Sequence, residues 1–245
     1  MKNNIICIKW GKKFDSSYVN KLYRAVSRNC TNFDRFICLT EDPENIDPNV
    51  EVFDIPRTDL EICWNKVTLF EKTLHDIEGR ILFFDLDVVI IDDINELFEY
   101  SKQSKFISIK EWWGGDYGMF TKEGVTPFNA SVMRFEVGSL EYVANNFYNK
   151  IQSMKKEKFW DEAVGHHGKV VYHDLMNLPP VVFNGDQEWT YYSLTQNNEK
   201  IDYYPSDWIT SYKLSESHQN SKIVVFHGVP KPDEVDEVFV KENWI

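Results

Sequence analysis

The segment 79–92, GRILFFDLDVVIID, places two aspartates inside a run of aliphatic and aromatic residues. A run this apolar predicts one buried strand. Because side chains alternate across a strand, Asp85 and Asp87 would point to the same face of the sheet. A buried carboxylate without a partner is strongly unfavourable, and two close together also repel each other. Their charge must therefore be offset by solvent at a strand end, by a basic side chain or by a cation.

The rest of the first half alternates strand and helix patterns. We expect strands over 4–9, 35–40 and 50–55 and helices over 15–29 and 64–78. Asp15 or Ser16 would be the N-cap of the first helix, and Gly79 would end the second. In the less regular second half we expect strands over 105–109, 130–135 and 222–228 and a helix over 139–154. This order predicts an α/β fold with a mixed, mainly parallel sheet flanked by helices.

Composition limits the class of protein. The 245 residues carry a formal net charge of −12, which argues against non-specific nucleic-acid binding. The four cysteines form no C-x-x-C pair, and no stretch approaches the roughly 18–20 apolar residues that a membrane span needs. We therefore expect a soluble cytoplasmic protein. Peripheral membrane association and the oligomeric state stay open.

The position of the aspartate pair suggests a metal site. In parallel α/β sheets, ligands bind at the carboxyl ends of the strands. Mg²⁺ and Mn²⁺ prefer carboxylate oxygens, and such a metal can bridge a protein to a diphosphate. The alternative is that one aspartate caps the following loop while the other is solvated.

Four segments, taken in order, resemble one known family. They are WNKVTLFEKTLHDIEGRILFFDLDVVI (64–90), FNASVMRFE (128–136), NGDQEW (184–189) and VVFHGVPKP (224–232). The set resembles GT-A fold nucleotide-sugar glycosyltransferases, closest to the glycosyltransferase family 8 type. The resemblance implies a single GT-A (Rossmann-like) domain over 1–245. Its nucleotide-binding half would be 1–100 and its acceptor-binding half 101–245.

The resemblance also implies ligands for a metal and a nucleotide sugar. Asp85, Asp87 and His227 would bind the metal, and the imidazole nitrogen shifts the preference from Mg²⁺ towards Mn²⁺. Four further residues would contact the donor; they are Lys66, Asn129, Gly228 and Lys231. Lys9, Gly11 and Tyr18 match the family's base and ribose site by position alone. The structural alternatives are that Tyr18 is a core residue and that the lysines are exposed on the surface.

The reacting centre would lie at Asp186 and Gln187, with Asp186 on sugar hydroxyls and Gln187 close to the anomeric carbon. Asp186 is also a good N-cap for the helix pattern that follows it. Three tryptophans are candidates for stacking on an acceptor sugar; they are Trp112, Trp113 and Trp189. The first two adjoin Gly114 and Gly115, which would suit a lid. Each tryptophan could equally be a core residue.

The implied activity is metal-dependent transfer of a sugar from a nucleotide-diphosphate sugar, a UDP-sugar, to a hydroxyl of a carbohydrate or glycoconjugate. Metal and Lys231 would stabilise the charge of the departing diphosphate. Family 8 implies retention of the anomeric configuration. An inverting reaction would instead need a general base such as Asp186.

Two other classes of protein fit parts of the chain. FFDLDVVI also matches the nucleophile motif of haloacid-dehalogenase-type Mg²⁺-dependent phosphatases. In that family, however, the motif usually opens the domain and the lysine follows it, whereas here about eighty residues and Lys66 precede it. A non-catalytic carbohydrate-binding module would keep the aromatic residues but would have little need for Asp85, Asp87, His227 and Lys231 together.

Overall fold

A seven-stranded sheet forms the centre of the protein. The structure is a computed structural model and describes residues 1–112, 127–159, 169–177 and 181–245. The strands lie in the order β11-β6-β7-β4-β1-β2-β3. They are β1 (Asn3–Lys9), β2 (Arg35–Thr40), β3 (Glu51–Phe53), β4 (Arg80–Phe84), β6 (Phe106–Lys110), β7 (Phe128–Glu136) and β11 (Ile201–Tyr203). Only β7 runs antiparallel to its neighbours, which confirms the mixed, mainly parallel sheet.

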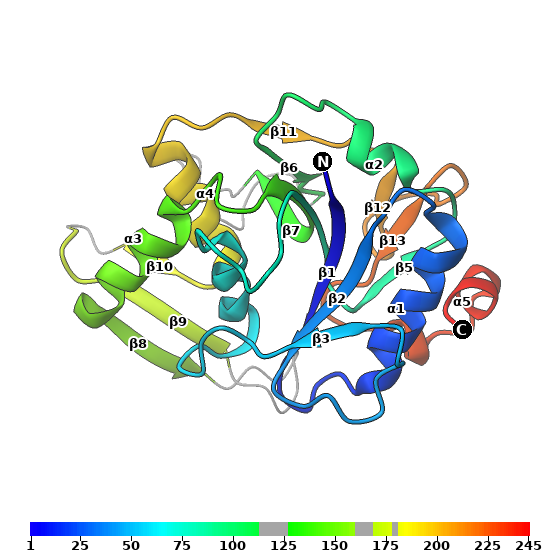
Figure 1. Ribbon diagram of the computed structural model, residues 1–245, viewed down its shortest axis with the longest axis horizontal. Coiled ribbons are helices and arrows are strands. Elements are labelled where there is room, and N and C mark those ends of the chain that lie inside the picture. The colour runs from blue at the N-terminus through cyan, green and yellow to red at the C-terminus, as the bar shows by residue number, and fades with distance from the viewer. Residues whose placement is uncertain (113–126, 160–168, 178–180) are drawn as a thin grey trace.

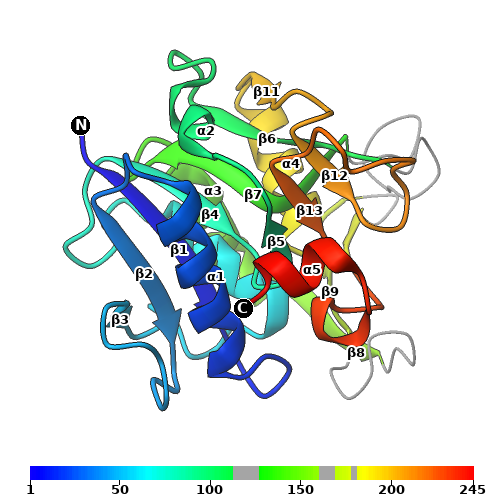
Figure 2. The same ribbon diagram turned by 90° about the vertical axis from the view of Figure 1, so that its right-hand side faces the viewer.

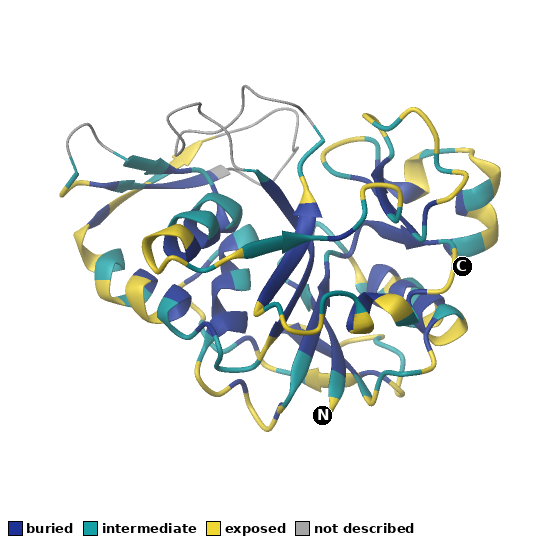
Figure 3. Cartoon of the chain, turned by 90° about the horizontal axis from the view of Figure 1, so that it is seen from above, coloured by how far each residue is buried: buried dark blue, intermediate teal, exposed yellow. Residues whose placement is uncertain are grey.

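The sheet is buried on both faces, and this explains its continuous apolar strands. In β4, Ile81 and Phe83 belong to the core beneath η1 (Ile62–Phe70), α3 (Tyr142–Lys150) and α4 (Asp186–Gln196). Leu82 and Phe84 belong to the opposite core, under α1 (Ser16–Asn29). The two groups of helices lie on opposite sides of the sheet in Figure 1, and dark, buried strands fill the space between them in Figure 3. Burying each such side chain contributes about 1.5–3 kcal/mol.

The predicted strand over 79–92 is wrong as a single strand. β4 ends at Phe84, the next three residues form a turn, and β5 (Val88–Ile90) joins a different sheet. That sheet has the order β12-β13-β5, with β12 (Ile209–Ser211) and β13 (Ile223–Val225). Both apolar runs are buried, so two strands in two sheets look like one in the sequence. The turn places Asp85 and Asp87 at the carboxyl end of β4.

The predicted helix over 64–78 is also wrong in type and length. The structure forms a 3₁₀ helix, η1, over Ile62–Phe70, and only an isolated bridge between Leu74 and Ile77 follows it. Trp64, Val67 and Phe70 are all buried. Their spacing of three residues matches the three residues per turn of a 3₁₀ helix, which aligns them on one face.

Other predicted elements are confirmed with small shifts of their ends. α1 begins after Asp15, whose side chain accepts a hydrogen bond from the backbone N–H of Ser17. The helix predicted over 139–154 is α3, followed by η2 (Ile151–Ser153) and by β8 from Met154. The remaining helices are α2 (Asn95–Glu99), η3 (Pro232–Glu234) and α5 (Val238–Asn243), and Figure 2 shows α5 beside α1.

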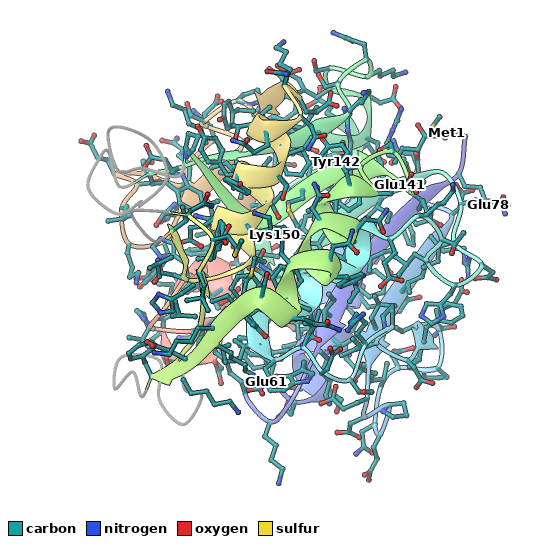
Figure 4. The ribbon with its side chains drawn as sticks, turned by 90° about the vertical axis from the view of Figure 1, so that its left-hand side faces the viewer. Met1, Glu61, Glu78, Glu141, Tyr142 and Lys150 are labelled. Carbon is teal, nitrogen blue, oxygen red and sulfur yellow. The ribbon has the colours of Figure 1, made fainter. Side chains whose placement is uncertain are left out.

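A third sheet lies beside α3 and supports η1. It has the order β10-β9-β8, with β8 (Met154–Phe159), β9 (Lys169–Asp174) and β10 (Val181–Phe183). Lys150, at the end of α3, pairs with Asp174 of β9 at 2.9 Å, and Glu61, just before η1, pairs with Lys156 of β8 at 2.6 Å. Figure 4 labels Lys150 and Glu61 on this face. The third sheet is thus connected by ion pairs to the end of α3 and to the residue that precedes η1.

Strands from both proposed halves of the chain share the central sheet. β6, β7 and β11 come from beyond residue 100 and continue the sheet formed by β1 to β4. No sheet boundary therefore falls at residue 100. Within the described ranges, no helix is both long enough and apolar enough to cross a bilayer.

Gly79, directly before β4, has a backbone conformation and a close contact that favour glycine. It is not a helix C-cap; its φ is +89°, and an added Cβ would lie 2.5 Å from the carbonyl oxygen of Lys2. We expect Gly79→Ala to lower the free energy of unfolding by about 3 kcal/mol, combining a left-handed backbone cost of roughly 1–2 kcal/mol with a steric clash. Gly11→Ala is the matched control, because Gly11 has φ +67° but open space at its Cβ. Urea denaturation of both variants measures the difference, and equal losses would contradict the clash.

Candidate active site

A pocket opens at the carboxyl ends of β1 and β4. Three segments supply its wall: the loop after β1, the 3₁₀ helix η1 and the turn after β4. The lining residues are Ile8, Trp10, Lys13, Phe14, Ile62, Cys63, Lys66, Phe83, Asp85, Leu86 and Asp87. The two aspartates of the turn therefore face one pocket, as the alternation of side chains predicted, although they lie in a turn rather than a strand.

Asp85 is paired with Lys66, which projects from η1. Lys66 Nζ lies 2.7 Å from Asp85 Oδ1 and 3.4 Å from the carbonyl oxygen of Ala130. The lysine side chain is only 12% exposed. Burial lowers its pKa, but the carboxylates of Asp186 and Asp85 outweigh burial and hold the pKa of Lys66 above its ordinary value. Lys66 is therefore charged in this pocket and neutralises Asp85.

Asp87 is paired with Lys231, 144 residues further along the chain. The antiparallel pairing of β5 with β13 brings the two segments together, and Phe226 N donates to the carbonyl oxygen of Asp87 at 2.9 Å. Lys231 Nζ also donates to the carbonyl oxygen of Phe226 at 3.1 Å. Asp87 and Lys231 are both at most 9% exposed, so the pair is held in a largely dry environment.

The segment that carries Lys231 is fixed on both sides. The backbone N–H of Lys231 donates to Glu234 Oε2 at 2.6 Å. The next residue but one, Asp233, accepts a hydrogen bond from the hydroxyl of Tyr18 in α1. The Tyr18 ring packs between Phe14 and Trp244, with ring centroids 4.7 and 5.4 Å away. The structure thus gives Tyr18 a packing and positioning role rather than an open face for a base.

His227 follows Phe226 and lies beside the aspartate turn. Its Nε2 and Ser211 Oγ are 2.7 Å apart, and its ring stacks on Trp112 with centroids 5.6 Å apart. Burial, assisted by Lys213 and Lys231, lowers the pKa of His227 to about 4. The imidazole is therefore neutral at pH 7, which is the form that binds metals.

These residues fit a divalent metal by donor type. Two carboxylates and a neutral imidazole come from adjacent segments, and oxygen with one nitrogen ligand suits Mn²⁺ or Mg²⁺. In the described part of the chain, however, no three His, Cys, Asp or Glu side chains already converge on one point. Lys231 would have to release Asp87 for a metal to bind. The predicted metal set of Asp85, Asp87 and His227 thus remains a prediction with a defined structural requirement.

Asp186 lies deep beside Lys66 and is not the predicted N-cap. Gly185 occupies the N-cap position of α4, and Asp186 is the first helical residue. Its Oδ2 is buried without a hydrogen-bond partner among the described residues, 3.9 Å from Lys66 Nζ. Burial, which outweighs the attraction of Lys66, raises the pKa of Asp186 to about 6. A carboxylate left unsatisfied in this way is available for a ligand.

The other predicted residues near the reacting centre are held by the β7 backbone. Gln187 Oε1 accepts a hydrogen bond from Ala130 N at 3.1 Å. Asn129 Oδ1 accepts one from Ser131 N at 2.9 Å, and Asn129 is 6% exposed. Gly228, with φ +71°, lies close to the Lys213 ammonium. Gln187 follows Asp186 at the start of α4, while the amide oxygen of Asn129 is occupied by the backbone of its own strand.

Two predicted nucleotide-binding residues, Lys9 and Gly11, are not among the residues that line the pocket. Lys9 is buried and paired with Asp42 at 3.0 Å, and Gly11 N donates to Glu41 Oε1 at 2.5 Å. The side chains that line the pocket from this loop are Trp10, Lys13 and Phe14, none of which was among the predicted site residues. The sequence feature that could have identified them is their position directly after a parallel strand, where ligands bind in such sheets.

The three tryptophans predicted to contact an acceptor lie in different environments. Trp189 is fully buried, donates to the carbonyl oxygen of Val143 at 2.9 Å and packs on Phe147 and Phe183. It is a core residue, and the predicted contact with an acceptor is wrong for this position. Trp112 is half-buried and stacks on His227. Trp113, with the lid predicted around Gly114 and Gly115, lies outside the described residues.

Comparison with known proteins identifies the fold. No family model matches the chain, and no curated protein matches it. The galactosyltransferase LgtC, in complex with donor and acceptor sugar analogs, matches with a TM-score of 0.57 and 13% identity, over 94% of this chain and 88% of LgtC. The glycosyltransferase GlyE of Streptococcus pneumoniae TIGR4 matches with a TM-score of 0.62 and 10% identity, over 100% of this chain and 60% of GlyE. The protein therefore has the GT-A-type fold of these glycosyltransferases, as predicted. Membership of family 8 stays a prediction.

The raised pKa of Asp186 predicts a pH-dependent stability. Below about pH 3 the carboxyl is protonated in both the folded and the unfolded protein. As the pH rises from about 4 to about 6, the carboxyl ionises in the unfolded protein but burial keeps it protonated in the folded one, so the folded protein loses up to about 3 kcal/mol of stability. We expect Asp186→Asn to be more stable than wild type by about this amount at pH 7 and equally stable at about pH 3. Urea denaturation at both pH values measures this, and a gain that does not change with pH would contradict it.

Proposed function

We propose that the protein is a metal-dependent glycosyltransferase that moves a sugar from a UDP-sugar to an acceptor hydroxyl with retention. The observation that carries the proposal is the pocket at the carboxyl ends of β1 and β4. There a GT-A-type fold brings together an Asp-x-Asp turn, Lys66 and Lys231. A transferase of this type needs carboxylates for a metal and cations for a diphosphate at one place.

The two lysines would stabilise the departing diphosphate. When the bond between the anomeric carbon and the phosphate oxygen breaks, negative charge moves onto the phosphate. Lys66 and Lys231 are both charged and largely buried, so their interaction with that charge is weakly screened by water. Asp85, Asp87 and His227 would hold the metal, which when bound supplies further charge neutralisation at the diphosphate.

The reacting sugar would lie between the aspartate turn and the start of α4. Asp186 has an unsatisfied carboxylate oxygen there, and it would accept hydrogen bonds from sugar hydroxyls. Gln187 is adjacent and would face the anomeric carbon. The acceptor oxygen forms its bond to that carbon as the phosphate bond breaks. In the retaining reaction, the acceptor proton passes to the departing phosphate on the same face. Proton NMR of the first product formed distinguishes this from inversion, in which Asp186 would be the base.

The acceptor would approach over Trp112. This half-buried ring stacks on His227, one of the proposed metal ligands, and an aromatic face can also stack on a sugar. The chemical class proposed for the acceptor is a carbohydrate or glycoconjugate. A non-catalytic carbohydrate-binding module would also use Trp112, but it would not bind a nucleotide through a metal.

Binding of a nucleotide through a metal is the direct test. Thermal-shift measurements would compare UDP, GDP, CMP and dTDP, each with Mn²⁺, Mg²⁺ or EDTA. We expect one nucleoside diphosphate with Mn²⁺ to raise the melting temperature by about 5–10 °C at 100 times its dissociation constant, and EDTA to abolish the rise. Asp87→Asn and His227→Ala should lose the metal-dependent part. Asp92→Asn is the matched control, because Asp92 is exposed beyond β5.

The competing functions predict different outcomes. The phosphatase alternative predicts no nucleotide-induced shift, together with Mg²⁺-dependent hydrolysis of a phosphomonoester. A carbohydrate-binding module predicts stabilisation by free sugars alone. If Asp87→Asn and His227→Ala both keep the full nucleotide-induced rise in melting temperature, the proposed metal ligands are contradicted.

A further inference from the structure

One lysine of the pocket has no ion-pair partner among the described residues. Lys66 is paired with Asp85, and Lys231 is paired with Asp87. A third lysine, Lys13, lines the same pocket from the loop after β1. Among the described residues, no carboxylate forms an ion pair with Lys13. Lys13 is therefore a cation of the pocket that a ligand could contact.

Lys13 is placed close to the diphosphate-binding groups of the proposed site. Lys13 Nζ lies 5.1 Å from the centroid of the Phe14 ring, and Lys231 Nζ lies 5.5 Å from the same centroid. Both ammonium groups are thus gathered around one phenyl ring. The Lys13 side chain adjoins Asp85 and Asp87 in the pocket wall.

Lys13 and Lys231 carry like charges and lie against the same phenyl ring. Two cations that repel each other over a partly apolar surface are stabilised by an anion that contacts both. Phe14 attracts each ammonium group through its ring face, but a neutral ring does not cancel the repulsion between them.

We propose that Lys13 binds the diphosphate of the nucleotide donor, together with Lys231. The ligand class is a nucleoside diphosphate, and its second phosphate is the group that Lys13 recognises. This inference rests on the proposed function and extends it to a residue outside the four resembling segments. It also predicts that the site discriminates a nucleoside diphosphate from the corresponding monophosphate.

The neighbouring lysine provides a matched control. Lys12 has the same charge and the same loop, but it is exposed and does not line the pocket. Removing either charge changes the net charge of the protein equally. A difference between Lys12→Gln and Lys13→Gln therefore reports a local contact rather than the general field of the protein.

The experiment is titration calorimetry of wild type, Lys13→Gln, Lys13→Arg and Lys12→Gln. The probes are UDP, UMP, uridine and inorganic pyrophosphate, each with Mn²⁺, with melting temperatures measured to verify folding. We expect Lys13→Gln to weaken UDP and pyrophosphate binding about ten-fold, which is typical for loss of one charge-assisted hydrogen bond, while UMP and uridine change little. Lys13→Arg and Lys12→Gln should bind like wild type.

The outcomes separate this inference from the proposed function. If Lys13→Gln binds UDP with the same affinity as wild type, the role of Lys13 is overturned and the transferase proposal stays intact. An equal loss for UDP and uridine also overturns it, because Lys13 would then act on the nucleoside. If wild type binds pyrophosphate but no nucleotide, and Lys13→Gln weakens it ten-fold, Lys13 is an anion ligand while the transferase proposal fails. Absence of binding to every probe overturns both.

Discussion

The compensation of two carboxylates at the end of a buried strand is the interaction on which the rest of the site depends. Asp85 and Asp87 follow β4, which has a hydrophobic core on each face, so water cannot solvate both carboxylates freely. Lys66 and Lys231 neutralise them, one from each side of the sheet. Because the lysines come from η1 and from the segment after β13, both layers must fold before the turn is stable.

Separate contacts hold Lys66 in η1 and Lys231 in the segment after β13. On one side, η1 is tied by Glu61 to β8 of the third sheet. On the other side, the segment after β13 is held by the pairing of β5 with β13 and by the hydrogen bond between Tyr18 and Asp233. These supports lie outside the pocket. Their purpose is positional, since charged groups act on a ligand only when they are held in place before it arrives.

The pocket retains groups that oppose folding. Among the described residues, Asp186 has a buried carboxylate oxygen without a hydrogen bond, and Lys13 lies near Lys231 without an ion pair to a carboxylate. A structure selected for stability alone would not keep either arrangement. Under the proposed function, hydroxyls and phosphates of a sugar donor would be the partners of these two groups.

Sequence alone determined the α/β class, most strands of the central sheet, and the placement of Asp85 and Asp87 together at one site. Local patterns carry that information, because alternation and apolar runs arise from burial within each element. Only the tertiary structure separated β4 from β5, made residues 62–70 a 3₁₀ helix and buried Trp189 in the core. It also paired Lys231 with Asp87 across 144 residues and turned Lys13, rather than Lys9, into the pocket. Such choices depend on which surfaces meet in the folded chain, and no local pattern in the sequence encodes them.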